Sequence, residues 1–335
     1  MKKRLLCIIL LFGSLFAAVA VLSVLVGAAP ISPCKILWGL VRGWCGGIPL
    51  IAPHEKTILL SIRVPRIILA ATVGAALSLS GVVFQAILRN PLAEPFILGM
   101  SGGAAVGAIA GILIGFGASS IAIPTLAFSG AFMAVAIVFV TGRRAERFDA
   151  TTMLLAGVVV NAFCSAIIMF LISLSGSAGL RGITFWLMGN LGSATGGEIA
   201  LALLVLAVCA GVVFALARPL NLIVAGEETA MHLGIDVERT KIILFTATSL
   251  MTAVAVSYAG IIGFVGLVIP HMTRMLLGSD HRIVLPASLF FGAAFLVAAD
   301  TVARIAVPHA ELPVGVITAF IGAPFFVYLL RTKVR

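Results

Sequence analysis

The segment Gly226-Glu227-Glu228-Thr229-Ala230-Met231-His232-Leu233-Gly234-Ile235-Asp236-Val237-Glu238-Arg239-Thr240-Lys241 is a charged island in a chain that is otherwise almost entirely apolar. Apolar stretches flank it at 199–217 and 241–261. Each stretch is long enough to cross a hydrocarbon core of about 30 Å as a helix. Because charged groups are unfavourable in lipid, the island is expected at one membrane face. The island separates these two predicted spans. Its charge indicates that it contacts another protein.

The composition agrees with a membrane protein. Of the 335 residues 61% are hydrophobic and 10% charged, and the mean hydropathy is +1.23. Soluble proteins carry about 25% charged residues, so a water-soluble fold is excluded. The net charge of +10 fits the Lys and Arg of cytoplasmic loops better than a nucleic-acid site, which also uses interleaved aromatic residues.

The pattern predicts an all-α polytopic membrane fold, with one transmembrane domain over residues 1–335. Each span is expected to be helical because lipid offers no partner for unpaired backbone groups. The first apolar run exceeds a signal-peptide core of about 7–15 residues, so we interpret it as a retained span. The ten expected spans are 5–29, 64–88, 97–118, 121–141, 151–175, 199–217, 241–261, 263–278, 284–306 and 312–330.

The basic residues predict the orientation. An even number of spans puts both termini on one side, and most of the 22 basic residues fall in loops on that side. Because cytoplasmic loops are rich in Lys and Arg, both termini and the loop 218–240 are expected in the cytoplasm. The chain is therefore predicted to be a multi-pass protein of the cell (inner) membrane.

Two patterns concern helix packing and symmetry. Glycine recurs every four residues from Gly99 to Gly115, which favours close helix contact, with the wall of a substrate path as the alternative. Ser78–Gly81 and Ser257–Gly260 each precede a proline at equal distance, which suggests an inverted internal repeat.

Few residues suit chemistry. Asp300 and Arg304 stand at i and i+4, either as a self-satisfied pair or as a functional group at membrane depth. No metal-ligand spacing, nucleophile elbow or phosphate-binding loop occurs, so no metal, cofactor or enzymatic activity is expected in this chain. Any ATP-driven work must come from a partner.

The five cysteines are interpreted in two groups. Cys7, Cys164 and Cys209 lie in apolar runs, as small hydrophobic residues do. Cys34 and Cys45 share one extramembrane loop, where a disulfide is expected if the compartment is oxidising.

Several short motifs together carry a family resemblance over almost the whole chain. They are Arg63-Val64-Pro65-Arg66, Asn90-Pro91-Leu92-Ala93-Glu94-Pro95, Leu154-Leu155-Ala156-Gly157, Trp186-Leu187-Met188-Gly189, the island at Glu228–Gly234, Gly263-Phe264-Val265-Gly266-Leu267-Val268-Ile269-Pro270-His271, Ala299-Asp300-Thr301-Val302-Ala303-Arg304 and Glu311-Leu312-Pro313-Val314-Gly315. In this order they resemble the iron-chelate, haem and cobalamin permease family, the membrane subunits of type II ATP-binding-cassette (ABC) importers.

The resemblance implies a homodimer of ten-helix subunits, two cytoplasmic ATPase subunits that hold ATP and Mg, and an extracytoplasmic substrate-binding protein. It also implies roles for residues of this chain. ATPase coupling falls on Glu227, Glu228, Thr229, Ala230 and Gly234. Docking of the binding protein falls on Arg63, Arg66 and Arg304, with snorkelling at the membrane edge as the alternative for the first two. The cytoplasmic gate falls on Asn90, Leu92, Ala150 and Thr151, of which Ala150 departs from the family pattern.

The sequence therefore predicts a permease subunit of an ABC importer for a metal chelate, namely an iron siderophore, haem or cobalamin, working by alternating access. The alternatives are an ion-coupled secondary transporter, which needs intramembrane carboxylates beyond Asp300, and a polytopic membrane enzyme.

Overall fold

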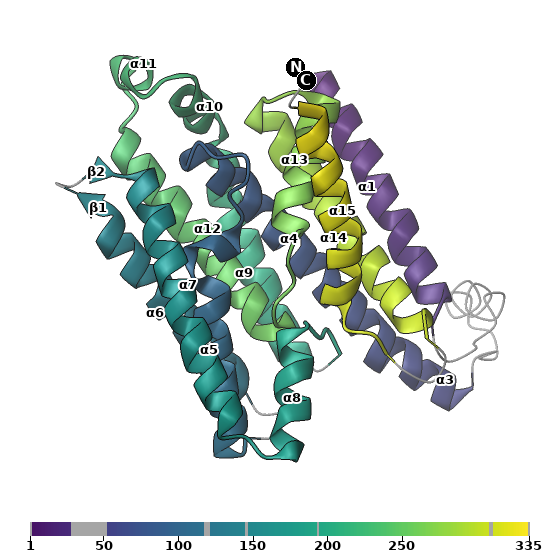
Figure 1. Cartoon of the computed structure of the whole chain (residues 1–335). Coiled ribbons are helices and arrows are strands. Elements are labelled where there is room, and N and C mark those ends of the chain that lie inside the picture. Colours follow the sequence, from purple (N-terminus) through teal and green to yellow (C-terminus); the bar gives the residue numbers. More distant parts are fainter. Residues whose placement is uncertain are drawn as a thin grey trace.

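The computed structural model describes residues 2–27, 52–116, 121–144, 147–192, 194–307 and 311–333 as a bundle of helices (Figure 1). The all-α membrane fold is confirmed. The elements are α1 (Lys2–Leu25), α3 (Pro53–Thr57), a π-helix η1 (Ile58–Arg63), α4 (Val64–Ile87), a 3₁₀-helix η2 (Pro95–Leu98), α5 (Met100–Ile114), α6 (Ala122–Gly142), β1 (Arg143–Arg144), β2 (Arg147–Phe148), α7 (Ala150–Ser173), α8 (Ser177–Leu187), α9 (Gly196–Ala215), α10 (Ala217–Ala225), α11 (Glu227–His232), α12 (Val237–Ala259), α13 (Val265–Leu277), α14 (His281–Ile305) and α15 (Val314–Lys333).

In the part of the chain that the structure describes, each expected span overlaps a helix. Within the described residues, seven helices are long and apolar enough to cross a membrane, while α5, α13 and the apolar part of α15 are shorter. Figure 1 places both termini, α10 and α11 at one end of the bundle and α8 and α3 at the other. We call these the terminal end and the opposite end. Cys34 and Cys45 lie outside the described residues, so their disulfide stays a prediction.

The second span is longer than the sequence indicates. Helix runs without interruption from Pro53 to Ile87, about 52 Å at 1.5 Å per residue, which exceeds the hydrocarbon core. Pro65, near the start of α4, does not break it. The preceding turns widen into the π-helix η1.

The short helices α5 and α13 each follow a stretch without α-helix. Residues 260–264 separate α12 from α13, and Gly260 and Phe264 both have positive φ. The Glu94 side chain, just before η2, accepts a hydrogen bond from the backbone N–H of Phe264. Irregular backbone inside a membrane bundle needs such protein partners, because lipid supplies none.

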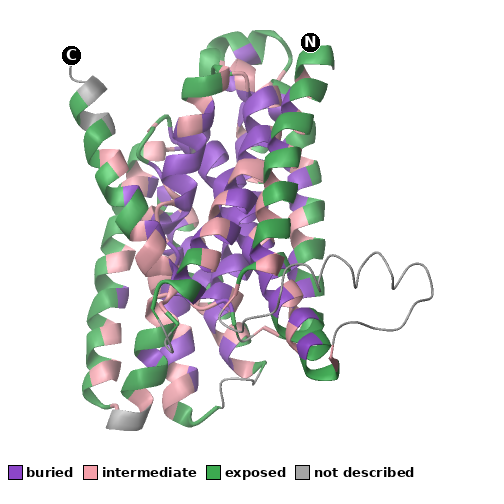
Figure 2. Ribbon diagram, turned by 90° about the vertical axis from the view of Figure 1, so that its right-hand side faces the viewer, coloured by how far each residue is buried: buried purple, intermediate pink, exposed green. Residues whose placement is uncertain are grey.

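Burial is concentrated at the centre of the bundle. Figure 2 shows buried residues along the inner helices and exposed residues on the outer ones. Helix α4 is buried along most of its length, whereas α7 and α15 expose large apolar side chains such as Phe163 and Phe320. Such exposure suits contact with lipid or with another membrane subunit.

The glycine pattern is a packing device. A methyl group placed on Gly103 of α5 would collide with the carbonyl oxygen of Gly130 of α6, and one on Gly130 would collide with that of Gly103. The two backbones therefore touch directly, as small residues permit between membrane helices. The inverted repeat stays a prediction: its two segments lie within α4 and at the end of α12.

Candidate functional site: two polar ends of the bundle

The charged segment 226–241 contains a short helix. Helix α11 spans Glu227–His232, and α10 precedes it within the region expected to be a loop. Helix α11 ends in a Schellman motif: Ile235 N–H donates to the carbonyl of Ala230, and Gly234 N–H donates to that of Met231. Gly234 has a φ of +82°, the left-handed conformation that this stop requires.

Helix α11 has an inner and an outer face. Ala230 is fully buried and packs with Ile223 of α10 and Val237 of α12. On the outer side Met231 and Leu233 are 55% and 62% exposed. Exposed apolar side chains on a charged extramembrane helix are typical of a protein contact surface.

Glu227 joins three elements at the terminal end. Its Oε1 lies 3.0 Å from an Arg89 Nη2, and its Oε2 lies 2.9 Å from Lys241 Nζ. The Lys241 side chain is buried, and its ammonium lies 5.4 Å from the centre of the Phe148 ring. Glu227 therefore forms ion pairs with residues of its own chain, although the resemblance implied a role in ATPase coupling. Glu228 beside it is exposed.

Helix α10 is fastened to the start of α14. Asn221 Nδ2 donates to Asp280 Oδ1 at 2.7 Å, and the backbone N–H of His281 donates to Asn221 Oδ1 at 2.9 Å. The guanidinium of Arg282, followed by the Asn221 amide, holds the pKa of Asp280 well below its ordinary value. Asp280 also caps α14, so one carboxylate orders the helix start and the α10 contact.

The first predicted gate segment follows α4. Helix α4 ends in a second Schellman motif, with Arg89 in the left-handed conformation that glycine usually takes. Asn90 Oδ1 then accepts the N–H of Leu92 at 2.9 Å, and the Leu92 side chain is 43% exposed. The motif places the Arg89 side chain against Glu227. Asn90 follows Arg89 directly in the chain.

The second predicted gate segment is the start of α7. Ala150 and Thr151 form its first turn, and Asp149 caps it by accepting the N–H of Thr151 at 3.0 Å. Just before, the N–H of Phe148 donates to Glu238 Oε2 of α12 at 2.9 Å. Both gate segments are thus bonded to residues of the charged segment, one through Glu227 and the other through Glu238.

At the opposite end the predicted docking arginines are buried. Arg63, Arg66 and Arg304 are 4%, 8% and 6% exposed. Arg66 Nε lies 2.9 Å from Asp300 Oδ1, and Arg304 Nε lies 3.0 Å from Asp300 Oδ2. The predicted pairing of Asp300 with Arg304 is confirmed, and Arg66 extends it.

Further contacts tie this arginine cluster to neighbouring elements. Arg66 Nη1 lies 2.7 Å from Glu311, whose side chain is 55% exposed. Arg63 donates to the carbonyl of Val24 at 2.9 Å, and Arg304 donates to the Ser23 hydroxyl at 2.7 Å. The cluster therefore joins α1, α4, α14 and the segment before α15, and Glu311 is its outward-facing member.

Sequence reasoning missed some of these residues. Thr195 and Glu198 form a capping box at the start of α9, which the Thr-x-x-Glu spacing signals. The roles of Glu227, Lys241 and Asp280 rest on distant partners, and no local pattern reveals them. Within the described ranges, no group of three or more His, Cys, Asp or Glu side chains comes together as metal ligands do.

Comparisons with known proteins agree with this architecture. Residues 15–332 match the model of the FecCD transport family. The chain is 47% identical over 287 residues to the cobalamin import system permease protein BtuC of Halobacterium salinarum, covering 86% of this chain and 76% of that protein. It is 41% identical over 304 residues to the vitamin B12 import system permease protein BtuC of Klebsiella pneumoniae, covering 88% and 90%.

Solved structures share the fold. One is described as an inward-facing conformation of a metal-chelate type ABC transporter; it is 31% identical, with a TM-score of 0.84 over 99% of this chain and 100% of that chain. A second, PsaBC from Streptococcus pneumoniae in complex with Fab, is 17% identical with a TM-score of 0.55 over 79% and 89%, a likeness of fold alone. On the strength of the family match and these relatives, the chain belongs to the FecCD transport family.

Proposed function

We propose that this chain is the membrane permease subunit of an ABC importer for a metal chelate. Cobalamin is the first candidate cargo, because the similar proteins of H. salinarum and K. pneumoniae carry that name. Iron siderophores and haem are the other candidates. The observation that carries the proposal is helix α11, an exposed, partly apolar contact helix at the terminal end of a membrane transport protein.

The outer face of α11 suits a cytoplasmic ATPase. Glu228, Met231 and Leu233 offer a charge beside two exposed apolar side chains. Protein interfaces commonly combine an apolar centre with a polar rim. The ATPase would hold ATP and Mg, and this chain would receive its movement.

Movement of α11 has a bonded route to both gate segments. Glu227 contacts Arg89, next to Asn90, and Glu238 contacts Phe148, two residues before Ala150. Displacement of α11 and the start of α12 would thus pull on both gate segments together. In this mechanism Glu228 meets the ATPase, whereas Glu227 transmits the displacement.

A second copy of this chain would complete the path. Helices α7 and α15 present large exposed apolar residues along their length, among them Val159, Phe163, Phe320 and Val327. A homodimer closed by these helices would place the cargo route between the subunits, with access alternating as the gate segments move.

Docking of a substrate-binding protein at the opposite end would begin at Glu311. Arg66 is reached through a cavity of about 310 Å³ that Glu311 also lines. An acidic residue of the binding protein would compete with Glu311 for the guanidinium of Arg66. Charge pairing of this kind favours orientation and association rate more than affinity.

Transport measurements in proteoliposomes test the proposal. The chain is reconstituted with its ATPase and binding protein, and uptake of cobalamin, a ferric hydroxamate siderophore and haem is measured with ATP inside. ATP-dependent uptake of one of them is expected. Uptake driven by an ion gradient without ATP would instead establish the secondary transporter.

A charge exchange tests the transmission route. Glu227→Arg should uncouple transport from ATP hydrolysis while the ATPase remains bound, and adding Arg89→Glu should recover part of the uptake. Glu228→Gln is the matched control on the outer face and should weaken ATPase copurification. If both single variants weaken binding equally, Glu227 is a docking residue and not a transmitting one.

A further inference from the structure

A lateral groove at the opposite end of the bundle is separate from the gate segments and borders the cavity at Arg66, with which it shares Asn190 and Ala194. One cavity of about 230 Å³ lies among α5, α6, α8, α9 and α12, and a second of about 250 Å³ lies among α6, α9 and α12. The two share Pro124, Ser257 and Tyr258 in their walls, so they form one continuous groove.

The arrangement of three helices creates the groove. Helices α6 and α9 both pack along α12 but hardly contact each other. Leu250 and Val254 of α12 form the floor, and Phe128 of α6 and Val205 of α9 form the walls. Leu204 of α9 is 59% exposed nearby, so the groove opens on the apolar outer surface of the bundle.

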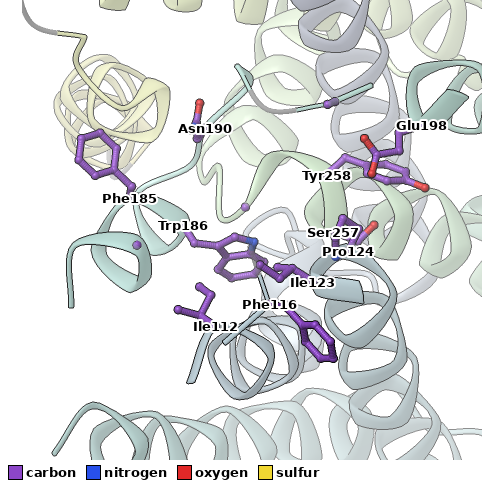
Figure 3. Close-up of a pocket in the computed structure, with 13 residues that line it drawn as sticks. Ile112, Phe116, Ile123, Pro124, Phe185, Trp186, Asn190, Glu198, Ser257 and Tyr258 are labelled. Atoms are coloured by element: carbon purple, nitrogen blue, oxygen red, sulfur yellow. The ribbon is translucent and has the colours of Figure 1, made fainter. Parts of the chain in front are cut away.

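The end of the groove farthest from the termini is polar and aromatic (Figure 3). Trp186, Tyr258 and Glu198 line it, and Glu198 is the charged side chain among the described residues of its wall. The Glu198 carboxylate is close enough to the Tyr258 phenol to act on it electrostatically. Aromatic side chains beside a carboxylate attract an organic cation.

The Glu198 carboxylate is held in place. Its Oε2 accepts the backbone N–H of Thr195 at 2.6 Å and the Thr195 hydroxyl at 2.9 Å. This capping box fixes the side chain at the start of α9. A ligand cation would therefore find a preorganised partner.

We propose that this groove binds a membrane lipid with an ammonium headgroup, of the ethanolamine type. The lipid chain lies along Phe128, Val205 and Val254, and the ammonium lies at Glu198 beside Tyr258, with Trp186 across the cavity. Charge complementarity selects the lipid, because the carboxylate attracts an ammonium and repels the net negative charge of a glycerol phospholipid. The headgroup end at Glu198 borders the proposed docking cavity at Arg66 but does not include Arg66 or Glu311.

Lipid retention tests the site directly. The full chain is purified from nanodiscs that contain equal amounts of phosphatidylethanolamine and phosphatidylglycerol, and the lipid that remains bound is quantified by native mass spectrometry. Phosphatidylethanolamine is expected to be preferred about tenfold, the ratio that roughly one charged contact supports. Equal retention of the two lipids would overturn the proposal.

Two variants locate the site. Glu198→Gln keeps the capping box, because glutamine also serves at that position, and should abolish the preference. Glu228→Gln, a carboxylate loss at the terminal end, should leave it unchanged. Leu201→Trp fills the groove and should lower retention of both lipids. If Leu201→Trp has no effect on lipid retention, the groove holds no lipid. The same conclusion follows if Leu201→Cys yields a disulfide-linked dimer, because the groove then lies against a second copy of this chain.

Discussion

The two ends of the bundle both carry ion pairs, but they differ in their access to solvent. At the terminal end the Glu227 side chain is 32% exposed, and its partner Arg89 is 52% exposed. At the opposite end Asp300 is 1% exposed between two buried arginines. Exposed pairs rearrange at little free-energy expense, whereas buried pairs are strongly disfavoured once separated. The Arg89–Glu227 pair therefore suits a moving contact, whereas the Asp300 pairs suit a fixed one.

The largest effect is expected at Asp300. Asp300→Ala leaves Arg66 and Arg304 buried without their shared carboxylate, so the free energy of unfolding should fall by about 3–5 kcal/mol. Chemical denaturation of the purified protein in detergent measures this. A loss of unfolding free energy below about 1 kcal/mol lies in the range of surface ion pairs. It would mean that the arginine cluster is exposed to solvent and that the two ends do not differ.

A smaller loss is expected at Glu227. Glu227→Ala removes the hydrogen-bonded partner of the buried Lys241 ammonium, so stability should fall by about 1.5 kcal/mol, the low end for a bond to a charged group. Adding Lys241→Met should restore most of it, because no unpaired ammonium then remains. Glu228→Ala is the matched control, expected to stay within about 0.5 kcal/mol in the same denaturation assay. Equal losses for the two glutamates would contradict the role of Glu227.

Glu311 should matter less than Asp300 for stability. Glu311→Gln removes an exposed partner of Arg66 while Asp300 remains, so the loss should be about 0–1 kcal/mol and should vanish in concentrated salt. Denaturation at low and high ionic strength checks this. A loss as large as that of Asp300→Ala would mean that Arg66 depends on Glu311.

The smallest expected effect is the loss of stability at low pH through protonation of Asp280. The pKa of Asp280 is lowered in the folded chain, so its stabilisation is present above the unfolded value of about 3.9 and disappears as the pH falls through the lower native value. Hydrogen exchange of the α10 amides should therefore accelerate only below about pH 4. Asp280→Asn retains a good cap and should remove this pH dependence. An unchanged acid response in the variant would assign it to another group.

Much of the helical architecture could be predicted from the sequence, because lipid leaves helix as the solution for each apolar run. The uninterrupted helix from Pro53 through Pro65 could not, because a proline inside a helical pattern ordinarily ends or kinks the helix. Helix α10 was also missed, since nine residues between charged positions carry a weak signal.

The candidate site was predicted by residue type more readily than by geometry. The sequence singled out Glu227, Arg66 and Arg304, but their partners lie far away along the chain. Arg66 and Asp300 are 234 positions apart, and only the packing of α4 on α14 brings them together. The solvent exposure of the ion-paired side chains, which differs between the two ends, likewise depends on how the helices pack.

The reciprocal glycine contact between α5 and α6 has a mechanical consequence. With Gly103 and Gly130 seated carbonyl against Cα, neither helix can slide along the other without driving a neighbouring side chain into the opposing backbone. In the proposed transport mechanism the two helices would therefore move as one rigid unit. Opening would then bend the chain at the borders of this unit, where it leaves α6 for β1 and enters α5 from η2.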